Sequence, residues 1–279
     1  MSRLGVRWTI GDVSGDGFRA LRLSIAAARR AFGPQTELAV CVNTVPVEEA
    51  RERVGKLPCE VSWRAAERED VPEFLRRRLD GGMAEGVGWK FAPLRIFPAL
   101  HELSLDNDCI VWEAPRAVRE WLADPRPTFV AAADVRTCFG QFVSWCGPEP
   151  LNSGIRGLPP AFDLGRALEQ LLEEHPVTLR SELDEQGMQM AVLRRSGPVR
   201  VVGVDEVSIC SPFPPHLPGL GRCGAHFVGL NARELPWKLD GRPASELTSA
   251  HFARHLPAVR ERAGLWDAPQ WTEGGAAAG

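Results

Sequence analysis

"VRWTIGDVSGDGFRALRLSIAAARRAFGPQTELAVCVN" (residues 6–43) contains the pattern that best indicates the class of fold. The apolar run at 6–10 predicts a strand, and the Gly- and Asp-rich turn at 11–17 ends it. Apolar residues at helical spacing then predict a helix over 17–32, which a Gly-Pro pair ends. A second apolar run at 37–43 predicts another strand. A strand, a helix and a strand in this order are typical of a βαβ unit, whose two strands lie parallel in one sheet.

The rest of the chain continues this alternation of strands and helices. Further strands are expected at 59–64, 103–112, 128–134, 141–146 and 199–209. Helices are expected at 70–79, 88–100, 160–175 and 183–193, with a break at Gly81-Gly82 between the first two. No repeat or linker divides the chain, so we expect one mixed α/β domain over 1–256, with a mostly parallel sheet flanked by helices. The segment 257–279 includes the low-complexity "TEGGAAAG" and is expected to be a partly disordered tail.

Composition narrows the class of protein. The 279 residues, 44% of them hydrophobic, can bury a core without disulfide bonds. A net charge of −3 gives no overall field that would attract nucleic acid or an anionic membrane, so neither is expected as a partner. Seven cysteines occur singly, without a C-x-x-C pair, which predicts free thiols in a reducing compartment. We find no signal-peptide core and no apolar run near the roughly 20 residues of a membrane span, so we expect a cytoplasmic location.

The stretch "LSLDNDCIVW" (103–112) places two aspartates inside an apolar segment. On one extended strand Asp106 and Asp108 would share a face, with Cα atoms roughly 6.6 Å apart. Carboxylates that close repel one another unless a cation is supplied, and a hard divalent ion such as Mg²⁺ or Mn²⁺ suits their oxygens. The carboxyl end of a strand is also where open α/β sheets bind ligands. The alternative is an acidic turn between two short strands, "HELSL" and "CIVW".

This segment and several later motifs together resemble a known enzyme family. "LSLDNDCIVW" resembles the D-x-D segment of GT-A fold glycosyltransferases, which use nucleotide sugars. The order of motifs is similar to glycosyltransferase family 8, the glycogenin-like and lipopolysaccharide-galactosyltransferase-like enzymes. The further motifs are "AAAD" (131–134), "LNSGI" (151–155), "DEQGM" (184–188) and "HFVG" (226–229). The resemblance covers most of residues 6–238 and implies a GT-A-like, Rossmann-like fold.

The resemblance also implies roles for particular residues. It implies a metal ion, Mn²⁺ or Mg²⁺, held by Asp106, Asp108 and His226, with Asn107 beside the ribose of the nucleotide. Near the nucleobase, which would be the uracil of uridine, it places Thr9, Gly11, Asp12 and Asn43. The turn that carries Gly11 and Asp12 also fits a simple Gly-rich turn with Asp16 as the N-cap of the helix.

Two more polar groups have the chemistry of a sugar site. Asp134, Asn152, Ser153 and Gly154 suit the hydroxyls of a sugar, and the glycine permits close approach of the backbone. Alternatively, N-S-G is an ordinary turn and Asp134 an ordinary strand-end residue. Asp184, Glu185 and Gln186 are candidate catalytic residues, with Asp184 or Glu185 as general base if the reaction inverts the sugar. The alternative for this patch is the first turn of a helix.

Cations for the diphosphate are less well defined. The chain has only three lysines, and Lys90 lies in the expected helix just before the D-x-D segment, where it would meet phosphate or remain a surface lysine. The family carries K-P-W near its H-F-x-G segment, which here ends at Gly229, whereas this chain reads "PWK" (236–238). The diphosphate contact therefore passes to Lys238 or Arg233, or is lost.

The sequence contains two other sets of potential metal ligands. Cys210, Cys223 and His226 offer three zinc ligands, but a structural zinc normally takes four. "DVSGDG" (12–17) resembles the first half of a calcium-binding EF-hand loop. The twelfth position of that loop, however, is Leu23 rather than glutamate, and a strand precedes the loop. Neither site is expected.

The sequence therefore predicts a metal-dependent glycosyltransferase that moves a hexose from a UDP-sugar to a hydroxyl of a glycan or small-molecule acceptor. By resemblance, the enzyme is expected to retain the anomeric configuration. One alternative is a non-catalytic GT-A-like domain that binds a nucleotide or glycan. A second alternative is a sugar-phosphate nucleotidyltransferase, which would need a basic Gly-rich loop where "GDVSGDG" has only acids.

Overall fold

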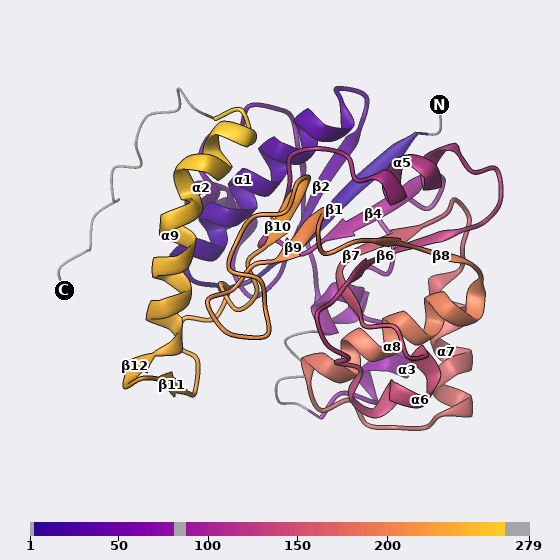
Figure 1. Ribbon diagram of the computed structural model, residues 1–279. Coiled ribbons are helices and arrows are strands. Elements are labelled where there is room, and N and C mark those ends of the chain that lie inside the picture. Colours follow the sequence, from indigo (N-terminus) through magenta and orange to yellow (C-terminus); the bar gives the residue numbers. More distant parts are fainter. Residues whose placement is uncertain (1–2, 81–87, 266–279) are drawn as a thin grey trace.

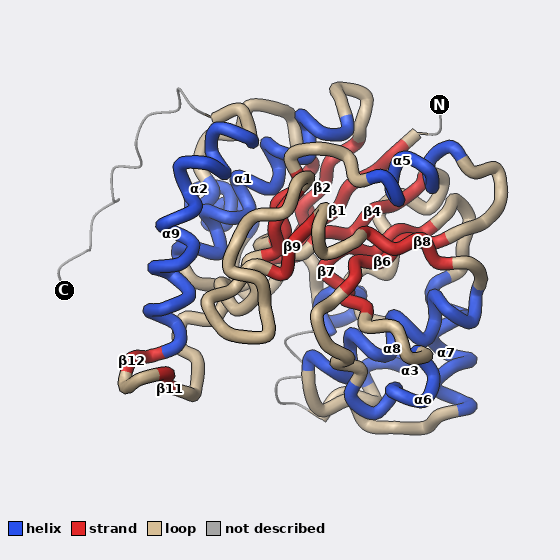
Figure 2. The backbone as a smooth tube through the Cα atoms, in the orientation of Figure 1, coloured by secondary structure: helices blue, strands red, loops and turns tan. Residues whose placement is uncertain are grey.

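The computed structural model describes residues 3–80 and 88–265. A seven-stranded sheet runs through the middle of the molecule, with helices on both sides (Figures 1 and 2). The predicted α/β class and mostly parallel sheet are confirmed. The predicted break at Gly81-Gly82 and the predicted disorder of "TEGGAAAG" lie outside the described residues.

The large sheet has the strand order β3-β2-β1-β4-β7-β6-β8. Its strands are β1 Leu4–Ile10, β2 Glu37–Val42, β3 Ser62–Ala65, β4 His101–Leu105, β6 Phe129–Ala133, β7 Leu151–Leu158 and β8 Val199–Val202. β7 is antiparallel to both of its neighbours, β4 and β6, while the other neighbouring pairs are parallel. The beginning of β7 therefore lies at the edge where the parallel strands end.

A second, three-stranded sheet lies beside the first, in the order β5-β10-β9. Its strands are β5 Cys109–Val111, β9 Val207–Ile209 and β10 Gly224–His226. β10 is antiparallel to β5 and parallel to β9. A small exposed hairpin, β11 Lys238–Leu239 with β12 Arg242–Pro243, precedes the last helix.

Helices cover both faces of the large sheet. On one face pack α1 Gly15–Phe32, α2 Val47–Val54 and α5 Arg116–Ala123. On the other pack α3 Glu73–Arg76, α6 Val143–Cys146, α7 Leu164–Glu174 and α8 Glu182–Ser196. The long α9 Ala244–Arg262 packs on the small sheet and on α1. Three 3-10 turns, η1 Arg68–Asp70, η2 Trp89–Phe91 and η3 Gly140–Phe142, complete these layers.

The first βαβ unit forms as the sequence predicts. In β1 the even-numbered residues Val6, Trp8 and Ile10 point into the core under α1, because side chains alternate along a strand. The buried Trp8 Nε1 donates to Ser24 Oγ (2.8 Å), and this hydroxyl donates to the carbonyl of Cys109 (2.6 Å). The pair satisfies the polar tip of a buried indole and joins α1 to both sheets.

Two predicted strands are each divided in the structure. Segment 103–112 gives β4 and β5, separated by a turn in which the Cys109 N–H donates to the Asp106 carbonyl (2.9 Å). The prediction that Asp106 and Asp108 lie on one strand was therefore wrong, and the alternative of an acidic turn describes the backbone. Segment 199–209 likewise gives β8 and β9, because a turn closed by Glu206 N–H to Gly203 O (3.0 Å) sends the chain to the small sheet.

Other local predictions also required correction. Segment 141–146 forms η3 and α6 rather than a strand, and its buried Phe142 and Cys146 are spaced i, i+4. In 88–100 the helical residues are Gly88 and those of η2, because Pro93 and Pro98 interrupt the helical hydrogen bonds beyond them. The helix expected at 70–79 shortens to α3.

At the C-terminal end, α9 continues through residue 256, where the tail was expected to begin. Its last turn keeps contact with the body of the molecule, since Val259 and Ala263 are buried against the small-sheet layer. No helix within 3–80 and 88–265 is long and apolar enough to cross a membrane.

Candidate functional site

The predicted polar residues meet at one edge of the large sheet. Asn43, Asp106 and Asp134 directly follow β2, β4 and β6, which end at this edge. Asn152 lies at the beginning of β7, which runs the other way and so starts there. The topology thus brings together four side chains that are far apart in the sequence, at the edge where α/β sheets bind ligands.

An acidic cluster occupies the turn after β4. Ligand atoms of Asp106, Asp108 and His226 all lie within 4.8 Å of one another. His226 Nε2 is 3.7 Å from Asp106 Oδ2 and 3.3 Å from Asp108 Oδ1. The carboxylates converge although they do not share a strand face, because β10 brings the imidazole against the turn. The structure brings together the three residues for which the resemblance implied a metal ion.

Lys90 supplies a positive charge within this cluster. Its Nζ lies 2.9 Å from Asp106 Oδ1 and 3.5 Å from Glu185 Oε2. Burial alone would lower the pKa of Lys90, but the two carboxylates outweigh it and raise the pKa above its ordinary value. Burial would also raise the pKa of Asp106, yet the neighbouring Lys90 holds it below the usual range. Lys90 is thus an internal counter-ion, and not a free surface lysine.

His226 is held tightly against its neighbours. Burial would lower its pKa, but contact with Asp108 and the charges of both aspartates raise it. Gly154 packs against the ring, because a Cβ at that position would lie 2.4 Å from His226 Cε1. Only glycine fits between this strand and the imidazole, which gives the glycine of the N-S-G segment a steric role.

The cluster has the chemistry of a divalent-metal site. Asp108 Oδ1 and His226 Nδ1 are both buried without a hydrogen-bond partner. A buried carboxylate oxygen without a donor costs free energy unless a cation compensates it. Two carboxylates and one imidazole suit Mn²⁺, and the carboxylates also suit Mg²⁺. The residues present therefore fit the ion that the sequence analysis expected.

Asn231 completes the turn and was not predicted. Its Nδ2 donates to Asn107 Oδ1 (2.9 Å) and to Asp108 Oδ2 (3.3 Å). Asn107 in turn donates from Nδ2 to the carbonyl of Gly17 (3.2 Å) at the start of α1. The hydrogen bond from Asn231 thereby holds Asp108 Oδ2, while Asp108 Oδ1 faces His226. No local pattern signals this role, because Asn231 lies in an irregular segment after "HFVG".

The predicted sugar-site residues form one hydrogen-bonded group. Asn152 Nδ2 donates to Asp134 Oδ2 (2.9 Å), and its Oδ1 accepts from the Gly154 N–H (2.7 Å). The Ser153 N–H donates to Gln186 Oε1 (3.2 Å), which joins β7 to α8. The N-S-G segment therefore lies in a strand and not in a turn. All four residues are buried together beside His226.

The Asp184–Gln186 patch lies in the first turn of α8, which was one of the alternatives for it. Its side chains have different hydrogen-bond partners. Asp184 accepts hydrogen bonds from the Gln141 N–H, from Gln141 Nε2 and from the Arg180 N–H, each at 2.8 Å. This carboxylate is fully engaged and positions the η3 turn. Gln186 Nε2 donates to the carbonyl of Cys138 (2.8 Å).

Glu185 is the buried acid of this patch. Burial raises its pKa to about 7, against the opposing effect of Lys90. Its Oε1 accepts from Gln189 Nε2, and Gln189 in turn accepts from the buried Arg156. Arg156 was not predicted, because a lone arginine in a strand gives no indication of its neighbours. Burial lowers the pKa of Arg156 to about 10.

The turn after β1 lies beside Asn43, as expected. A Cβ at Gly11 would lie 2.3 Å from Asn43 Oδ1, so this glycine permits a close approach. Thr9 Oγ1 accepts from the buried Arg7 (3.3 Å). Asp12 pairs with Arg53 Nη1 (3.0 Å), and also with Arg233. Thr9 and Asp12 are therefore each held by an arginine that the sequence analysis did not connect with them.

The alternative readings of this turn are corrected by the structure. The N-cap of α1 is Ser14, whose Oγ accepts from the Gly17 N–H (3.0 Å), and not Asp16. Asp16 pairs with Arg19 (2.9 Å). Since Ser14 Oγ also donates to the carbonyl of Leu230 (2.6 Å), the turn ties α1 to the segment after β10.

The remaining predicted cations lie apart from the acidic cluster. Lys238 is exposed on β11, in the hairpin that precedes α9 (Figure 1). Arg233 is engaged by Asp12. Gly229 has φ +83°, a conformation that favours glycine, and it turns the chain after "HFVG". In the described part of the chain, Lys90 is therefore the lysine that the structure brings to the aspartates.

The zinc set considered from the sequence does not assemble. His226 faces the aspartates, whereas Cys210 Sγ lies 3.3 Å from His251 Nε2. Cys223 belongs to neither of the two potential metal-binding groups found among residues 3–80 and 88–265. The thiol of Cys223 donates instead to Glu206 Oε1 (3.9 Å).

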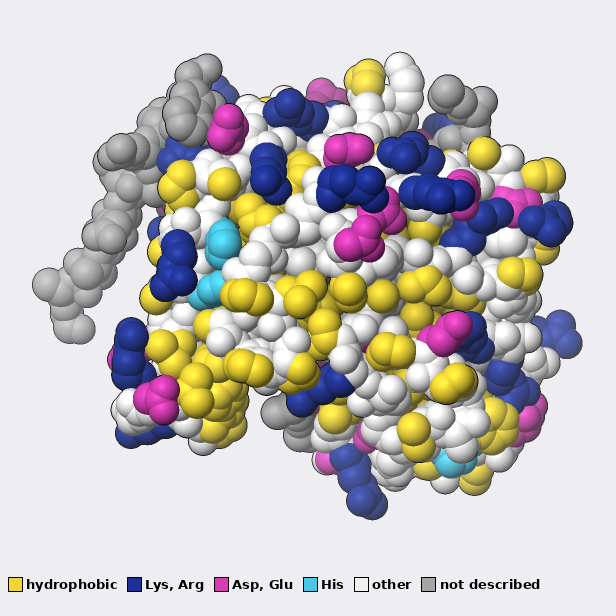
Figure 3. Space-filling view, viewed as in Figure 1, with side chains coloured by type: hydrophobic (Ala, Val, Ile, Leu, Met, Phe, Trp, Pro, Cys, Tyr) yellow, Lys and Arg dark blue, Asp and Glu magenta, His cyan; other side chains and the backbone are white. Residues whose placement is uncertain are grey.

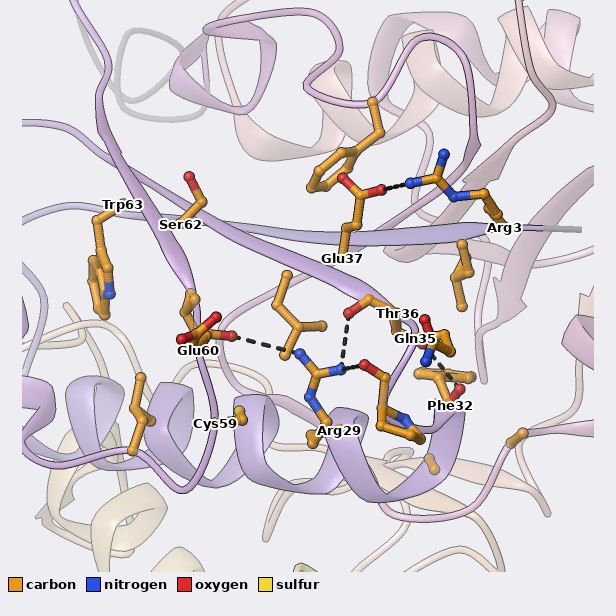
Figure 4. A pocket seen from close by; sticks show the side chains of 18 of the residues that line it. Arg3, Arg29, Phe32, Gln35, Thr36, Glu37, Cys59, Glu60, Ser62 and Trp63 are labelled. Atoms are coloured by element: carbon orange, nitrogen blue, oxygen red, sulfur yellow. Dashed lines mark hydrogen bonds and ion pairs between the residues drawn. The ribbon is translucent and has the colours of Figure 1, made fainter.

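A large groove of ≈ 2150 Å³ lies at the opposite edge of the sheet, where β1, β2 and β3 begin. Figure 4 shows that two of the arginines that line it, Arg3 and Arg29, are already engaged by neighbouring groups. Arg29 donates to the carbonyl of Thr36 (2.9 Å), and Arg3 pairs with Glu37. The face in Figure 3 likewise interleaves basic and acidic side chains rather than gathering one sign. The acidic cluster, and not this groove, is the candidate functional site.

No protein-family model matches the chain, and no curated protein sequence matches it. Among solved structures, the glycosyltransferase GlyE of Streptococcus pneumoniae TIGR4 is similar over 95% of this chain and 63% of its own, with 13% identity and a TM-score of 0.51. Mouse xyloside xylosyltransferase 1 is similar over 76% of this chain and 88% of its own, with 15% identity and a TM-score of 0.50. At these identities the likeness concerns the fold. The chain therefore has the GT-A fold of these glycosyltransferases, as its D-x-D segment and later motifs predicted.

Proposed function

We propose that this chain is a metal-dependent glycosyltransferase. It would move a hexose from a nucleotide sugar, a UDP-sugar, to a hydroxyl of a glycan or small-molecule acceptor, with retention of configuration. The observation that carries the proposal is the convergence of Asp106, Asp108 and His226 within 4.8 Å. This convergence occurs at the ligand-binding edge of a GT-A sheet.

Asp106, Asp108 and His226 would hold Mn²⁺ or Mg²⁺, which when bound would neutralise the charge of the departing diphosphate. The protein's own contribution is to hold these three ligands in place. Asn231 fixes Asp108 from one side, and Gly154 supports the imidazole from the other. Lys90 offsets the charge of Asp106 and lies where it would also reach an anionic donor.

The nucleotide would lie over the ends of β1 and β2. Its nucleobase would contact the backbone and side chains around Thr9, Gly11, Asp12 and Asn43, and its ribose would lie beside Asn107. These groups offer both donors and acceptors, which suit the edge of a uracil ring. Gly11 lets the backbone approach closely there.

The hexose would lie over the beginning of β7. Asp134, Asn152, Ser153 and Gly154 form its polar floor, and Gln186 holds Ser153 through the backbone (3.2 Å). The amide of Gln186 supports the sugar without abstracting a proton, which agrees with a retaining reaction. Asp184, with three hydrogen bonds from Gln141 and Arg180, acts in our proposal as a positioning residue. Glu185 is then the carboxylate available as a base if the reaction inverts.

One observation favours the non-catalytic alternative. Lys238 is exposed on a hairpin and Arg233 is engaged by Asp12, so neither stands free beside the aspartates. A domain without a second diphosphate cation would bind a nucleotide or glycan and turn it over slowly. We favour the enzyme because Lys90 occupies the acidic cluster and supplies a cation there.

The location is also a proposal. All seven cysteines are free thiols, which agrees with a reducing compartment such as the cytoplasm.

The decisive experiment measures donor turnover. The full chain is incubated with UDP-glucose or UDP-galactose, with Mn²⁺ or after chelation, and released UDP is quantified. Asp108→Asn is expected to lower metal-dependent turnover by at least about 100-fold, because it removes a charge that would hold the ion. Asp205→Asn, at a side chain 80% exposed, is the matched control and should retain turnover.

The other functions predict different products. Binding of the UDP-sugar without release of UDP from the wild-type chain would support the non-catalytic domain. Release of pyrophosphate from a nucleoside triphosphate and a sugar phosphate would support the nucleotidyltransferase. Equal turnover with and without a chelator would contradict the role of Asp106, Asp108 and His226.

A further inference from the structure

A second group of metal-ligating side chains lies outside the proposed donor site. Ligand atoms of Cys210, His251 and His255 lie within 4.8 Å of one another. Cys210 directly follows β9, and the two histidines are spaced i, i+4 on α9. That spacing places both imidazoles on one face of the helix. Cys210 and His251 are buried and His255 is half-buried, and histidine side chains reach the surface beside α9 (Figure 3).

The hydrogen bonds of His255 orient it as a ligand. Its Nε2 lies 2.9 Å from the carbonyl of Pro218, and a carbonyl only accepts, so Nε2 carries the hydrogen. The lone pair of the neutral ring is then on Nδ1. Histidines that bind metals commonly donate their other N–H to a backbone carbonyl in this way.

Cys210 and His251 already face each other. Cys210 Sγ lies 3.3 Å from His251 Nε2, so one hydrogen, carried by the thiol or by the imidazole, lies between them. Burial lowers the pKa of His251 to about 4, with His255 and Arg254 contributing, which keeps the imidazole neutral at neutral pH. Burial raises the pKa of Cys210 to about 12. A metal ion at this place would therefore displace a single thiol proton.

We propose that Cys210, His251 and His255 form a second metal site that binds zinc. A thiolate with two imidazoles suits a borderline ion such as Zn²⁺, whereas the carboxylates of the first cluster suit Mn²⁺ or Mg²⁺. Three protein ligands leave the fourth tetrahedral position to water, on the side where His255 approaches the surface.

Zinc here would join α9 to the sheet that carries His226. The Cys210 N–H donates to the carbonyl of His226 (2.7 Å), so the two sites share a backbone hydrogen bond. Beside this bond, Phe227 packs edge-on against Phe252 of α9, with ring centroids 5.0 Å apart. An ion between β9 and α9 would stabilise this contact and hold the backbone of His226 in place.

The test uses cobalt as a spectroscopic substitute for zinc. The full chain is freed of metal with a chelator, returned to chelator-free buffer and titrated with Co²⁺ and then Zn²⁺. We expect thiolate-to-cobalt charge-transfer absorption that saturates as Co²⁺ is added and disappears as zinc displaces cobalt. Zn²⁺ should also raise the melting temperature of the wild-type chain.

Variants distinguish cobalt binding at Cys210 from binding at another cysteine and from binding at the donor site. Cys210→Ser should lose the charge-transfer absorption, and His255→Gln should weaken Zn²⁺ binding at least about tenfold. His255 is half-buried, so its variant keeps the test valid if Cys210→Ser fails to fold. Cys223→Ser, at a buried cysteine outside the group, should retain the absorption.

The result is independent of glycosyl transfer, because Asp108→Asn should bind cobalt at Cys210 as the wild type does. Absence of charge-transfer absorption in the folded wild-type chain would overturn the proposal. Its persistence in Cys210→Ser would do the same, since another cysteine would then be the ligand.

Discussion

At the residue scale, the proposed donor site depends on a few close contacts around two aspartates. Lys90 offsets the charge of Asp106 at 2.9 Å, and His226 approaches Asp108 to 3.3 Å. Asn231 donates to the other oxygen of Asp108 (3.3 Å). The like charges are therefore tolerated by opposing charge and hydrogen bonds, even before an ion is considered.

The contact between Gly154 and His226 yields the first prediction. In Gly154→Ala, the new Cβ would lie 2.4 Å from His226 Cε1 and would displace the imidazole. We expect Mn²⁺ affinity, measured by calorimetry on the folded variant, to fall roughly 10–100-fold, as for other changes that misplace a ligand. Gly15→Ala is the control, because a Cβ there meets nothing within 4 Å. Unchanged affinity would show that His226 is not a ligand.

His101 yields a prediction on stability and pH. It is buried edge-on against Trp121, and burial, helped by the charge of Arg95, lowers its pKa below 6.5. The unfolded chain therefore binds a proton at His101 more readily than the native chain. Its contribution to stability is complete above about pH 6.5 and is lost as the pH falls below that value.

The measurement is the free energy of unfolding by urea at a series of pH values from about 7 to 5. His101→Gln should show a shallower decline than the wild type, because the variant has no group to protonate there. Parallel curves would contradict the pKa shift of His101.

At the element scale, the start of α8 is pressed against the chain at 138–142. A Cβ at Gly187 would lie 2.1 Å from the carbonyl oxygen of Phe139, so the two backbones touch. Gln186 Nε2 donates to the carbonyl of Cys138 (2.8 Å), and Cys146 Sγ donates to the carbonyl of Gly187 (3.2 Å). This packing fixes where Glu185 and Gln186 point, because the helix cannot rotate or slide without breaking these contacts.

Gly187→Ala tests that packing. The methyl group must push α8 away from Phe139, so we expect a loss of about 1–3 kcal/mol in the free energy of unfolding. Turnover of the donor should fall with it, since Gln186 moves with the helix. Leu183→Ala, at a side chain 39% exposed on the same helix, should change both quantities far less. A Gly187→Ala variant as stable as the wild type would refute the close approach.

At the scale of the whole molecule, the site is a product of topology. β1, β2, β4 and β6 end at one edge, β7 begins there, and the small sheet brings His226 across from a segment more than a hundred residues later in the chain. The segment after β10 also reaches α1, through the hydrogen bond from Ser14 Oγ to the carbonyl of Leu230 (2.6 Å). A donor bound at this edge would therefore contact segments from early and late in the chain.

Such a donor should stabilise the whole fold. In a thermal-shift panel, a UDP-sugar at about 100 times its dissociation constant adds about 2.7 kcal/mol, or roughly 5–10 °C for a chain of this size. We expect that shift only with Mn²⁺ present, and we expect Asp108→Asn to lack it. A panel without any metal-dependent shift would contradict binding of the donor at the acidic cluster.

Local pattern was sufficient for much of the fold and for part of the site. Alternating apolar runs predicted β1, α1 and β2, and the motif order predicted that Asp106, Asp108 and His226 would meet. Local pattern failed where tertiary contacts override it. Segment 140–146 is helical because Phe142 and Cys146 pack beneath α8, although their apolar run resembles a strand. Asn231 and Arg156 were missed because no local pattern reports a partner across the fold.

Local sequence was enough to predict the α/β class, the parallel unit at the start of the chain, and the acidic and imidazole groups available for a metal ion. These follow from periodicity and residue chemistry, which act over a few neighbouring residues. Three features depend instead on long-range packing: the turn 106–108 separates two sheets, Lys90 pairs with Asp106, and Cys210 faces α9 and not His226. Those outcomes depend on which distant segments pack together, because a side chain's partners are set by the fold around it.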